Sequence, residues 1–154
     1  MTTPVEVRLA ATVMLVRDGG QGLETFMLKR NPKSKFVPGQ FVFPGGAVDV
    51  KDQLIDEVET VSSGLDDYQA SDRLGIESGG LAYWVAAIRE CFEEAGALLA
   101  RIDGEDLPLT DPEVHERFQN HRNAIYDGDL TMVDLCRIEG LSMNFHDLRY
   151  VSHW

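Results

Sequence analysis

Three carboxylates and one guanidinium lie close together in the middle of this sequence, as Arg89, Glu90, Glu93 and Glu94. If the segment is helical, carboxylates at positions i, i+3 and i+4 fall within one turn of one another. Each such pair of like charges destabilises a helix by roughly 0.2–0.5 kcal/mol. A sequence that accepts this repulsion either leaves the glutamates solvated on an exposed face or uses them to bind a cation. Both interpretations stay open from these residues alone.

The element that must position these side chains is predicted to be a helix from about Leu81 to Ala95. At ~100° per residue the three glutamates share one side of this helix. The opposite side carries the apolar residues Trp84, Ile88, Cys91, Phe92 and Ala95. Because the glutamates stand in the C-terminal half, the helix macrodipole adds to their mutual repulsion. Gly96 is placed to end the helix in a left-handed cap.

Strands are predicted upstream of this helix. Apolar runs at 8–17 and 23–28 are separated by glycine-rich turn residues, which indicates a β-hairpin. A third strand is expected over 40–43. It ends at Gly45 and Gly46, and paired glycines permit positive φ and the close approach of another segment. The sequence therefore predicts a glycine loop after the third strand.

The remaining segments are predicted from their composition and spacing. Residues 53–81 are acidic with scattered apolar positions, and we interpret them as an insertion, partly helical and partly loop. Strands are expected at 97–102 and 148–154. Helices are expected at about 110–125 and 129–139, where start and stop signals flank apolar residues at helical spacing.

The charged cluster and the glycine loop resemble the two halves of the Nudix box, G-x5-E-x7-R-E-U-x-E-E-x-G-U, in which U is apolar. The second half is matched by Arg89, Glu90, Glu93, Glu94, Gly96 and Ala97, with Cys91 at the first apolar position. The first half is matched by Phe43, Pro44, Gly45 and Gly46. The chain is therefore similar to Nudix hydrolases, which use water and a divalent metal ion to split a diphosphate linkage.

The match contains one departure. Counted from Gly46, the acidic position of the box falls on Asp52, and a long insertion then separates Asp52 from Arg89, where the usual box has seven residues. A rival register starts at Gly75, at the standard distance from Arg89, but it places Leu81 at the acidic position and abandons the glycine loop. We prefer the register that begins at Gly46.

An interrupted box resembles a Nudix subgroup that includes peroxisomal coenzyme A diphosphatases. Residues 39–46 also read G-x3-F-P-G-G, a pattern of coenzyme A-cleaving members, although the rest of that signature is absent. The resemblance implies an α/β (α+β) Nudix fold, a mixed β-sheet between helices with the box as a loop, a helix and a loop. It implies a single domain over 1–154 with an insertion at about 53–81. Family members continue with further strands and a terminal helix, so we expect either that the chain is truncated at its C-terminus or that a partner completes the sheet.

The resemblance also implies roles for the charged residues. Glu90, Glu93 and Glu94 would coordinate Mg²⁺ or Mn²⁺ together with a backbone carbonyl near Gly46, because hard oxygen ligands suit these ions. Arg89 would orient the glutamates through charge-assisted bonds, unless it is a surface arginine that only relieves acidic repulsion. Glu90 or Glu93 is the candidate base, and a downstream carboxylate such as Glu139 is an alternative.

Substrate contacts are predicted in the basic loop before the third strand. Arg30 and Lys35 are candidates for a distal phosphate of the substrate, and Gly45 would contribute backbone conformation beside them. A loop that is basic only for solubility explains the same residues equally well. We expect the insertion to affect substrate choice more than the chemical step, because it contributes none of the glutamates.

Composition limits the partners. A formal net charge of −12 argues against nonspecific binding to a nucleic acid polymer or an anionic membrane, so a small phosphoanhydride is the expected substrate. Cys91 and Cys136 cannot form a disulfide framework, which favours a cytoplasmic location. The oligomeric state stays open, with a homodimer as the first guess.

Three functions are compared. The first is a hydrolase for a nucleoside diphosphate linked to another moiety, with coenzyme A derivatives, dinucleoside polyphosphates and nucleotide sugars as candidates. The second is a catalytically inactive Nudix-like module that binds such a ligand without cleaving it, and the third is an acidic helical interaction domain. Intact Glu90, Glu93 and Glu94 favour the hydrolase over the binding module.

Overall fold

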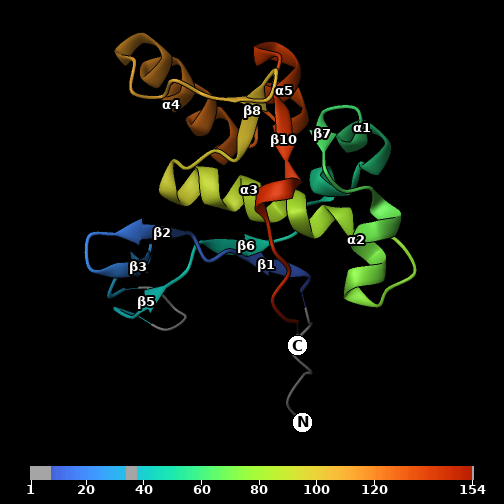
Figure 1. Cartoon of the computed structure of the whole chain (residues 1–154), viewed down its shortest axis with the longest axis horizontal. Helices are drawn as coiled ribbons and strands as arrows, with labels where there is room; N and C mark the ends of the chain where they lie inside the picture. The colour runs from blue at the N-terminus through green and yellow to red at the C-terminus, as the bar shows by residue number, and fades with distance from the viewer. Residues whose placement is uncertain (1–7, 34–37, 154) are drawn as a thin grey trace.

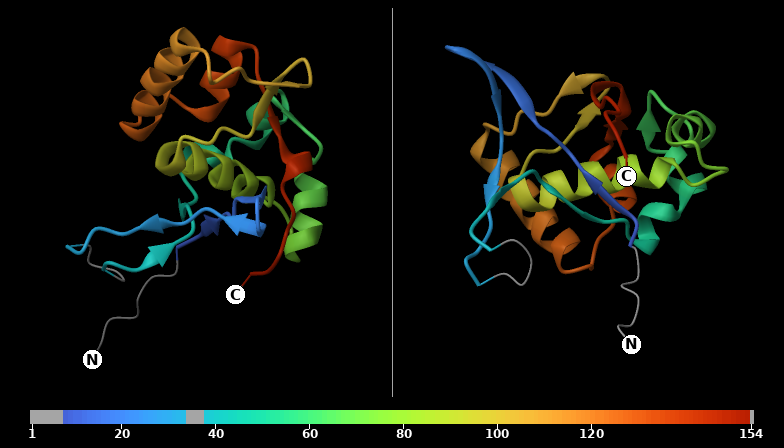
Figure 2. Two further views of the ribbon diagram at one scale, coloured as in Figure 1. Left: turned by 60° about the vertical axis from the view of Figure 1, so that its left-hand side comes forward. Right: turned by 90° about the horizontal axis from the view of Figure 1, so that it is seen from below.

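The long helix α3, Leu81–Ala95, runs through the centre of the molecule (Figure 1). A computed structural model describes residues 8–33 and 38–153. The bounds of α3 agree with the sequence prediction, and Gly96 caps it with a left-handed φ of 68°. The paired strands β1 and β6 lie on one side of α3 and α4 lies on the other (Figure 2). For this reason the helix is buried on more sides than a simple amphipathic pattern predicts, and even Arg89 is only 8% exposed.

The N-terminal third forms three short antiparallel pairs, and their strands are listed here: β1 Ala10–Thr12 with β6 Gly45–Ala47, β2 Val16–Gly19 with β3 Gly22–Thr25, and β4 Leu28–Lys29 with β5 Phe41–Val42. The predicted hairpin is present as β2 and β3. The prediction of one strand over 8–17 was wrong, because the segment divides into β1 and β2, which pair with different partners.

The prediction that Gly45 and Gly46 form a loop was also wrong. Both glycines lie in β6, where they pair with Thr12 and Ala11 of β1. Their small size is what the structure requires. A Cβ on Gly45 would lie 2.5 Å from the carbonyl oxygen of Ala11, and one on Gly46 would overlap the carboxylate of Glu90. The glycines therefore permit close approach, as predicted, but from a strand.

The insertion is folded into the body of the protein. It follows η1, Val50–Gln53, and its elements are α1 Ile55–Glu59, β7 Ser62–Ser63 and α2 Asp67–Leu74. This agrees with a segment that is partly helical and partly loop. The insertion also supplies core side chains, namely Val58, Val61, Leu65, Ala70 and Leu81. Removing the segment would expose this core, so point substitutions are better suited than a deletion for testing its effect on substrate choice.

The C-terminal half completes a four-stranded sheet in the order β7, β10, β8, β9. Its elements are β8 Ala100–Ile102, β9 Glu105–Asp106, α4 Pro112–Tyr126, α5 Met132–Glu139, β10 Ser142–Asn144 and η2 Phe145–Asp147. The two helices were predicted, and α5 starts three residues later than expected because Thr131 is its N-cap. The predicted strand at 148–154 was wrong: residues 148–153 form no strand, and β10 pairs with β7 and β8 instead.

The position of Val58 provides a test of the integrated insertion. Val58 is 0% exposed in α1, whereas Val50 is 78% exposed in η1. We expect Val58→Ala to lower the free energy of unfolding by about 2 kcal/mol, through lost apolar burial and the cavity left behind. Val50→Ala should change it by less than about 0.5 kcal/mol. Urea denaturation of both variants measures the difference, and equal effects would contradict a core role for the insertion.

Candidate active site

An ion pair between Asp52 and Arg89 joins the two halves of the box. The residues are 37 positions apart, yet Arg89 Nε lies 3.1 Å from Asp52 Oδ1 and Arg89 Nη2 lies 3.0 Å from Asp52 Oδ2. Asp52 is 3% exposed and Arg89 is 8% exposed. In the rival register, Gly75 is the left-handed cap of α2 and Leu81 is fully buried. The geometry therefore favours the register that begins at Gly46.

Arg89 uses its remaining donors on the glutamates and on the glycine strand. Its Nη1 lies 2.9 Å from Glu90 Oε1 and 3.1 Å from Glu93 Oε1, and its Nη2 donates to the carbonyl oxygen of Ala47 at 2.7 Å. Burial alone lowers the pKa of Arg89, but the bonds to Asp52 and the nearby glutamates raise it above its ordinary value. This buried guanidinium is not the surface arginine of the alternative interpretation.

Glu94 contacts the glycine strand directly. Its Oε2 accepts a hydrogen bond from the backbone N–H of Gly45 at 3.0 Å. Glu90 approaches the same strand at Gly46, where an added Cβ would lie 2.4 Å from Glu90 Oε1 in its present position. Glu90 and Glu93 are partly buried and Glu94 is exposed. The last turns of α3 therefore bring Glu90 and Glu94 into contact with β6, and Arg89 links Glu93 to the same strand through the carbonyl oxygen of Ala47.

The glutamate cluster carries an excess of negative charge. Within this group Glu90, Glu93, Glu94 and Asp52 face one cation, Arg89. Burial raises the pKa of Glu90; Arg89 lowers it, and the charges of Glu93 and Glu94 raise it further. A divalent cation would relieve this repulsion, and carboxylate oxygens are the ligands that Mg²⁺ and Mn²⁺ accept. The donor set thus fits such an ion.

The carboxylates are not arranged as a finished ligand set. Over residues 8–33 and 38–153, no three His, Cys, Asp or Glu side chains converge in a geometry that could hold a metal ion. Glu90 and Glu93 each turn one oxygen to Arg89, and Glu94 turns one to Gly45. Rotation of these carboxylates about their side-chain bonds would be needed to direct them at one ion.

Of the predicted substrate contacts, Gly45 lies in β6, and Arg30 lies beside another pair of strands, β4 and β5. Arg30 follows β4, is partly buried, and donates from its backbone N–H to the carbonyl oxygen of Gln40 at 2.9 Å. Lys35 lies outside the described residues. Glu139, the alternative base, is bound by Arg117 at 2.9 Å and by His121 at 2.8 Å, both on α4. The carboxylate of Glu139 is thus directed to α4.

Two contacts of the site were missed by sequence reasoning. Asp52 was placed at the acidic position of the box, but its ion pair with Arg89 depends on the fold of the insertion. Arg122, on α4, donates to the carbonyl oxygen of Glu93 at 2.6 Å and 2.8 Å. The box carries no signal for Arg122, which stands well outside it in sequence.

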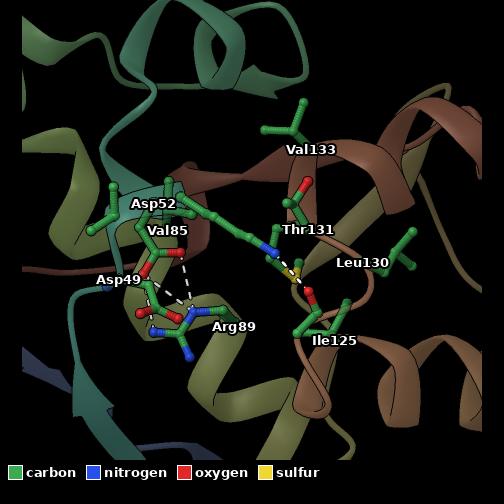
Figure 3. A pocket seen from close by; sticks show the side chains of 12 residues that line it. Asp49, Asp52, Val85, Arg89, Ile125, Leu130, Thr131 and Val133 are labelled. Atoms are coloured by element: carbon green, nitrogen blue, oxygen red, sulfur yellow. Dashed lines mark hydrogen bonds and ion pairs between the residues drawn. The ribbon is translucent and has the colours of Figure 1, made fainter.

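A cavity of about 250 Å³ adjoins the Asp52–Arg89 pair (Figure 3). Its walls come from η1, from α3 at Val85, and from the segment that joins α4 to α5, including Leu130 and Thr131. Lys51 Nζ donates to the carbonyl oxygen of Gly128 at 2.6 Å and ties η1 to this segment. Arg89 and Asp52 therefore each line the cavity on one side.

The fold is that of Nudix hydrolases. It resembles the crystal structure of a NUDIX hydrolase from Alicyclobacillus acidocaldarius, with a TM-score of 0.57 and 26% sequence identity, over 90% of this chain and 57% of that one. The family model of the NUDT19 Nudix domain matches residues 6–154. The chain therefore belongs to the NUDT19 Nudix domain family. The predicted α/β Nudix fold and the resemblance to coenzyme A diphosphatases are confirmed.

Two curated relatives of the chain carry the same family name, NUDT19. The acyl-coenzyme A diphosphatase NUDT19 of Xenopus laevis is 28% identical over 161 residues, which cover 85% of this chain and 41% of that protein. The human acyl-coenzyme A diphosphatase NUDT19 is 31% identical over 104 residues, which cover 53% of this chain and 28% of that protein. The chain thus spans less than half the length of these relatives. Among the described residues, no helix is long and apolar enough to cross a membrane.

Proposed function

We propose that this chain is a single Nudix hydrolase domain that uses Mg²⁺ or Mn²⁺ to hydrolyse the diphosphate linkage of a coenzyme A derivative. The observation that carries the proposal is the contact of Glu90 and Glu94 with the glycine strand β6, where Arg89 joins Glu90 and Glu93 to the carbonyl oxygen of Ala47. The names of the curated relatives support an acyl-coenzyme A as the substrate.

Each side chain has a proposed task. Glu90, Glu93 and Glu94 would hold the ion together with a backbone carbonyl near Gly46. A bound ion would polarise the phosphoryl oxygens and make water acidic enough to attack phosphorus. Arg89 keeps Glu90 and Glu93 oriented, because its planar fork fixes several oxygens at once. Either Glu90 or Glu93 would act as the base instead of as a ligand.

The proposal extends to the substrate and to the molecular setting. Arg30 and Lys35 would bind a distal phosphate of the substrate, beside the backbone of Gly45. The net charge of −12 supports a small substrate and no nucleic acid polymer. A cytoplasmic location and a homodimer belong to the same proposal, and sedimentation measurements test the dimer.

Product analysis tests the activity. The chain is incubated with acyl-coenzyme A, free coenzyme A, a dinucleoside polyphosphate and a nucleotide sugar, each with Mg²⁺, with Mn²⁺ or with EDTA. We expect metal-dependent release of two phosphorylated products, with a coenzyme A derivative preferred. Binding of a ligand without any product would favour the inactive binding module, and absence of both binding and turnover would remove the proposal.

Metal binding should stabilise the fold, because an ion that binds only the native arrangement shifts unfolding by mass action. At 100 times its Kd an ion adds about 2.7 kcal/mol. For a domain of this size that raises the melting temperature by roughly 5–11 °C. Differential scanning fluorimetry with Mg²⁺ or Mn²⁺ measures the shift. In Glu105→Gln, a change on exposed β9, the metal should raise the melting temperature as much as in the parent. In Glu94→Gln the rise should be much smaller. An unchanged melting curve in the parent would contradict the metal site.

A further inference from the structure

Arg122 is a side chain of α4 that reaches the C-terminal end of α3. Its Nε lies 2.8 Å from the carbonyl oxygen of Glu93, and its Nη2 lies 2.6 Å from the same oxygen and 3.2 Å from the carbonyl oxygen of Glu94. These bonds join the backbone of the two glutamates, whereas Arg89 binds side-chain carboxylates. The glutamate cluster is therefore bound by two arginines, Arg89 at side chains and Arg122 at the backbone.

The carbonyls that Arg122 binds have no donor within their own helix. The last four carbonyls of an α-helix lack an intrahelical N–H partner. Helix α3 ends at Ala95, and the N–H of Gly96 donates to the carbonyl oxygen of Phe92. The carbonyl oxygens of Glu93 and Glu94 therefore depend on a donor from another element. A guanidinium at this end also offsets the negative pole of the macrodipole, which the glutamates reinforce.

Gly96 lies next to the guanidinium of Arg122. A Cβ added to Gly96 would lie 3.4 Å from Arg122 Nη1. The left-handed cap and the arginine thus occupy adjoining space at the end of α3, on the turn that carries Glu93 and Glu94. A shift of this turn would move both carboxylates relative to Gly45 of β6, to which Glu94 is bonded.

We propose that Arg122 is a positioning residue for the metal site: it anchors the backbone of Glu93 and Glu94, so that the carboxylate of Glu93 stays on Arg89 and that of Glu94 stays on Gly45 of β6. This inference rests on the proposed function, because it concerns the same site. Arg122 touches neither substrate nor ion in this role. It acts on the affinity of the site for metal, through the last turn of α3.

Manganese binding without substrate tests the inference. Isothermal titration calorimetry with Mn²⁺ compares the parent with Arg122→Gln and Arg122→Lys. The matched control is Arg117→Gln, which removes the same charge from the same helix but from a side chain bound to Glu139. We expect Arg122→Gln to weaken Mn²⁺ binding roughly 10-fold to 100-fold, as loss of a supporting contact does elsewhere. Arg122→Lys keeps the charge, so its Mn²⁺ affinity should lie between those of the parent and Arg122→Gln. The Mn²⁺ affinity of Arg117→Gln should equal that of the parent.

The outcomes separate this inference from the proposed function. Thermal melting in EDTA shows which variants are folded. If Arg122→Gln is unfolded, the Mn²⁺ affinity of Arg122→Lys tests the inference. A purely structural role would lower the melting temperature and leave the Mn²⁺ affinity of the folded protein unchanged, which overturns the inference. If the parent binds Mn²⁺ and Glu94→Gln weakens it, while both Arg122 variants bind as the parent does, only the role of Arg122 fails. A parent that binds no Mn²⁺ overturns both proposals.

Discussion

Glu94→Gln is expected to slow turnover by roughly 10²-fold or more, since loss of a metal ligand removes several kcal/mol of transition-state stabilisation and ~1.4 kcal/mol is tenfold in rate. The fold should survive, because Glu94 is exposed and a glutamine oxygen can still accept the hydrogen bond from Gly45 N–H. Steady-state kinetics with the preferred substrate measure turnover, and thermal melting in EDTA shows whether the fold survives.

The alternative of a solvated acidic face predicts the opposite sign. Removing one of three clustered negative charges would then relieve repulsion, leave activity untouched and improve stability slightly. Glu105→Gln on β9 is the control for loss of an exposed carboxylate and should keep parental turnover. A folded Glu94→Gln protein that turns over within about twofold of the parent would remove Glu94 from the mechanism.

Arg89→Met is expected to lower the free energy of unfolding by about 3–5 kcal/mol, because it leaves the carboxylate of Asp52 buried without its partner. Asp52 is 3% exposed, and its Oδ2 also accepts the backbone N–H of Asp49 at 2.8 Å. Urea denaturation measures the loss. Arg17→Met is the contrast, since Arg17 and Glu24 form an exposed pair, which contributes only about 0–1 kcal/mol.

A double variant separates the fold from the site. Adding Asp52→Asn to Arg89→Met removes the uncompensated buried charge, and the asparagine oxygen can still accept from Asp49. Stability should return in part. Activity should stay low, since Glu90 and Glu93 would still lack the donor that orients them. Recovery of both stability and turnover would mean that Arg89 supports only the fold.

Much of the candidate site could be predicted because its signals are local. The bounds of α3 follow from the spacing of its apolar residues and from Gly96, and these depend on backbone geometry within a few residues. The side of the helix that carries the glutamates follows from the same periodicity. The split strand at 8–17 could not be predicted, because the division between β1 and β2 depends on which distant strand pairs with each part.

Tertiary structure decided how the box is assembled. The sequence by itself determined a helix with three glutamates on one side, a pair of glycines upstream and a strongly acidic composition. It could not determine that Asp52 meets Arg89, because that contact needs the insertion to fold back with Val58 in the core. The contact between Arg122 and the carbonyls of α3 depends likewise on the packing of α4. Periodicity and capping act over one or two turns, whereas contacts between distant segments are set by the shared burial of apolar side chains.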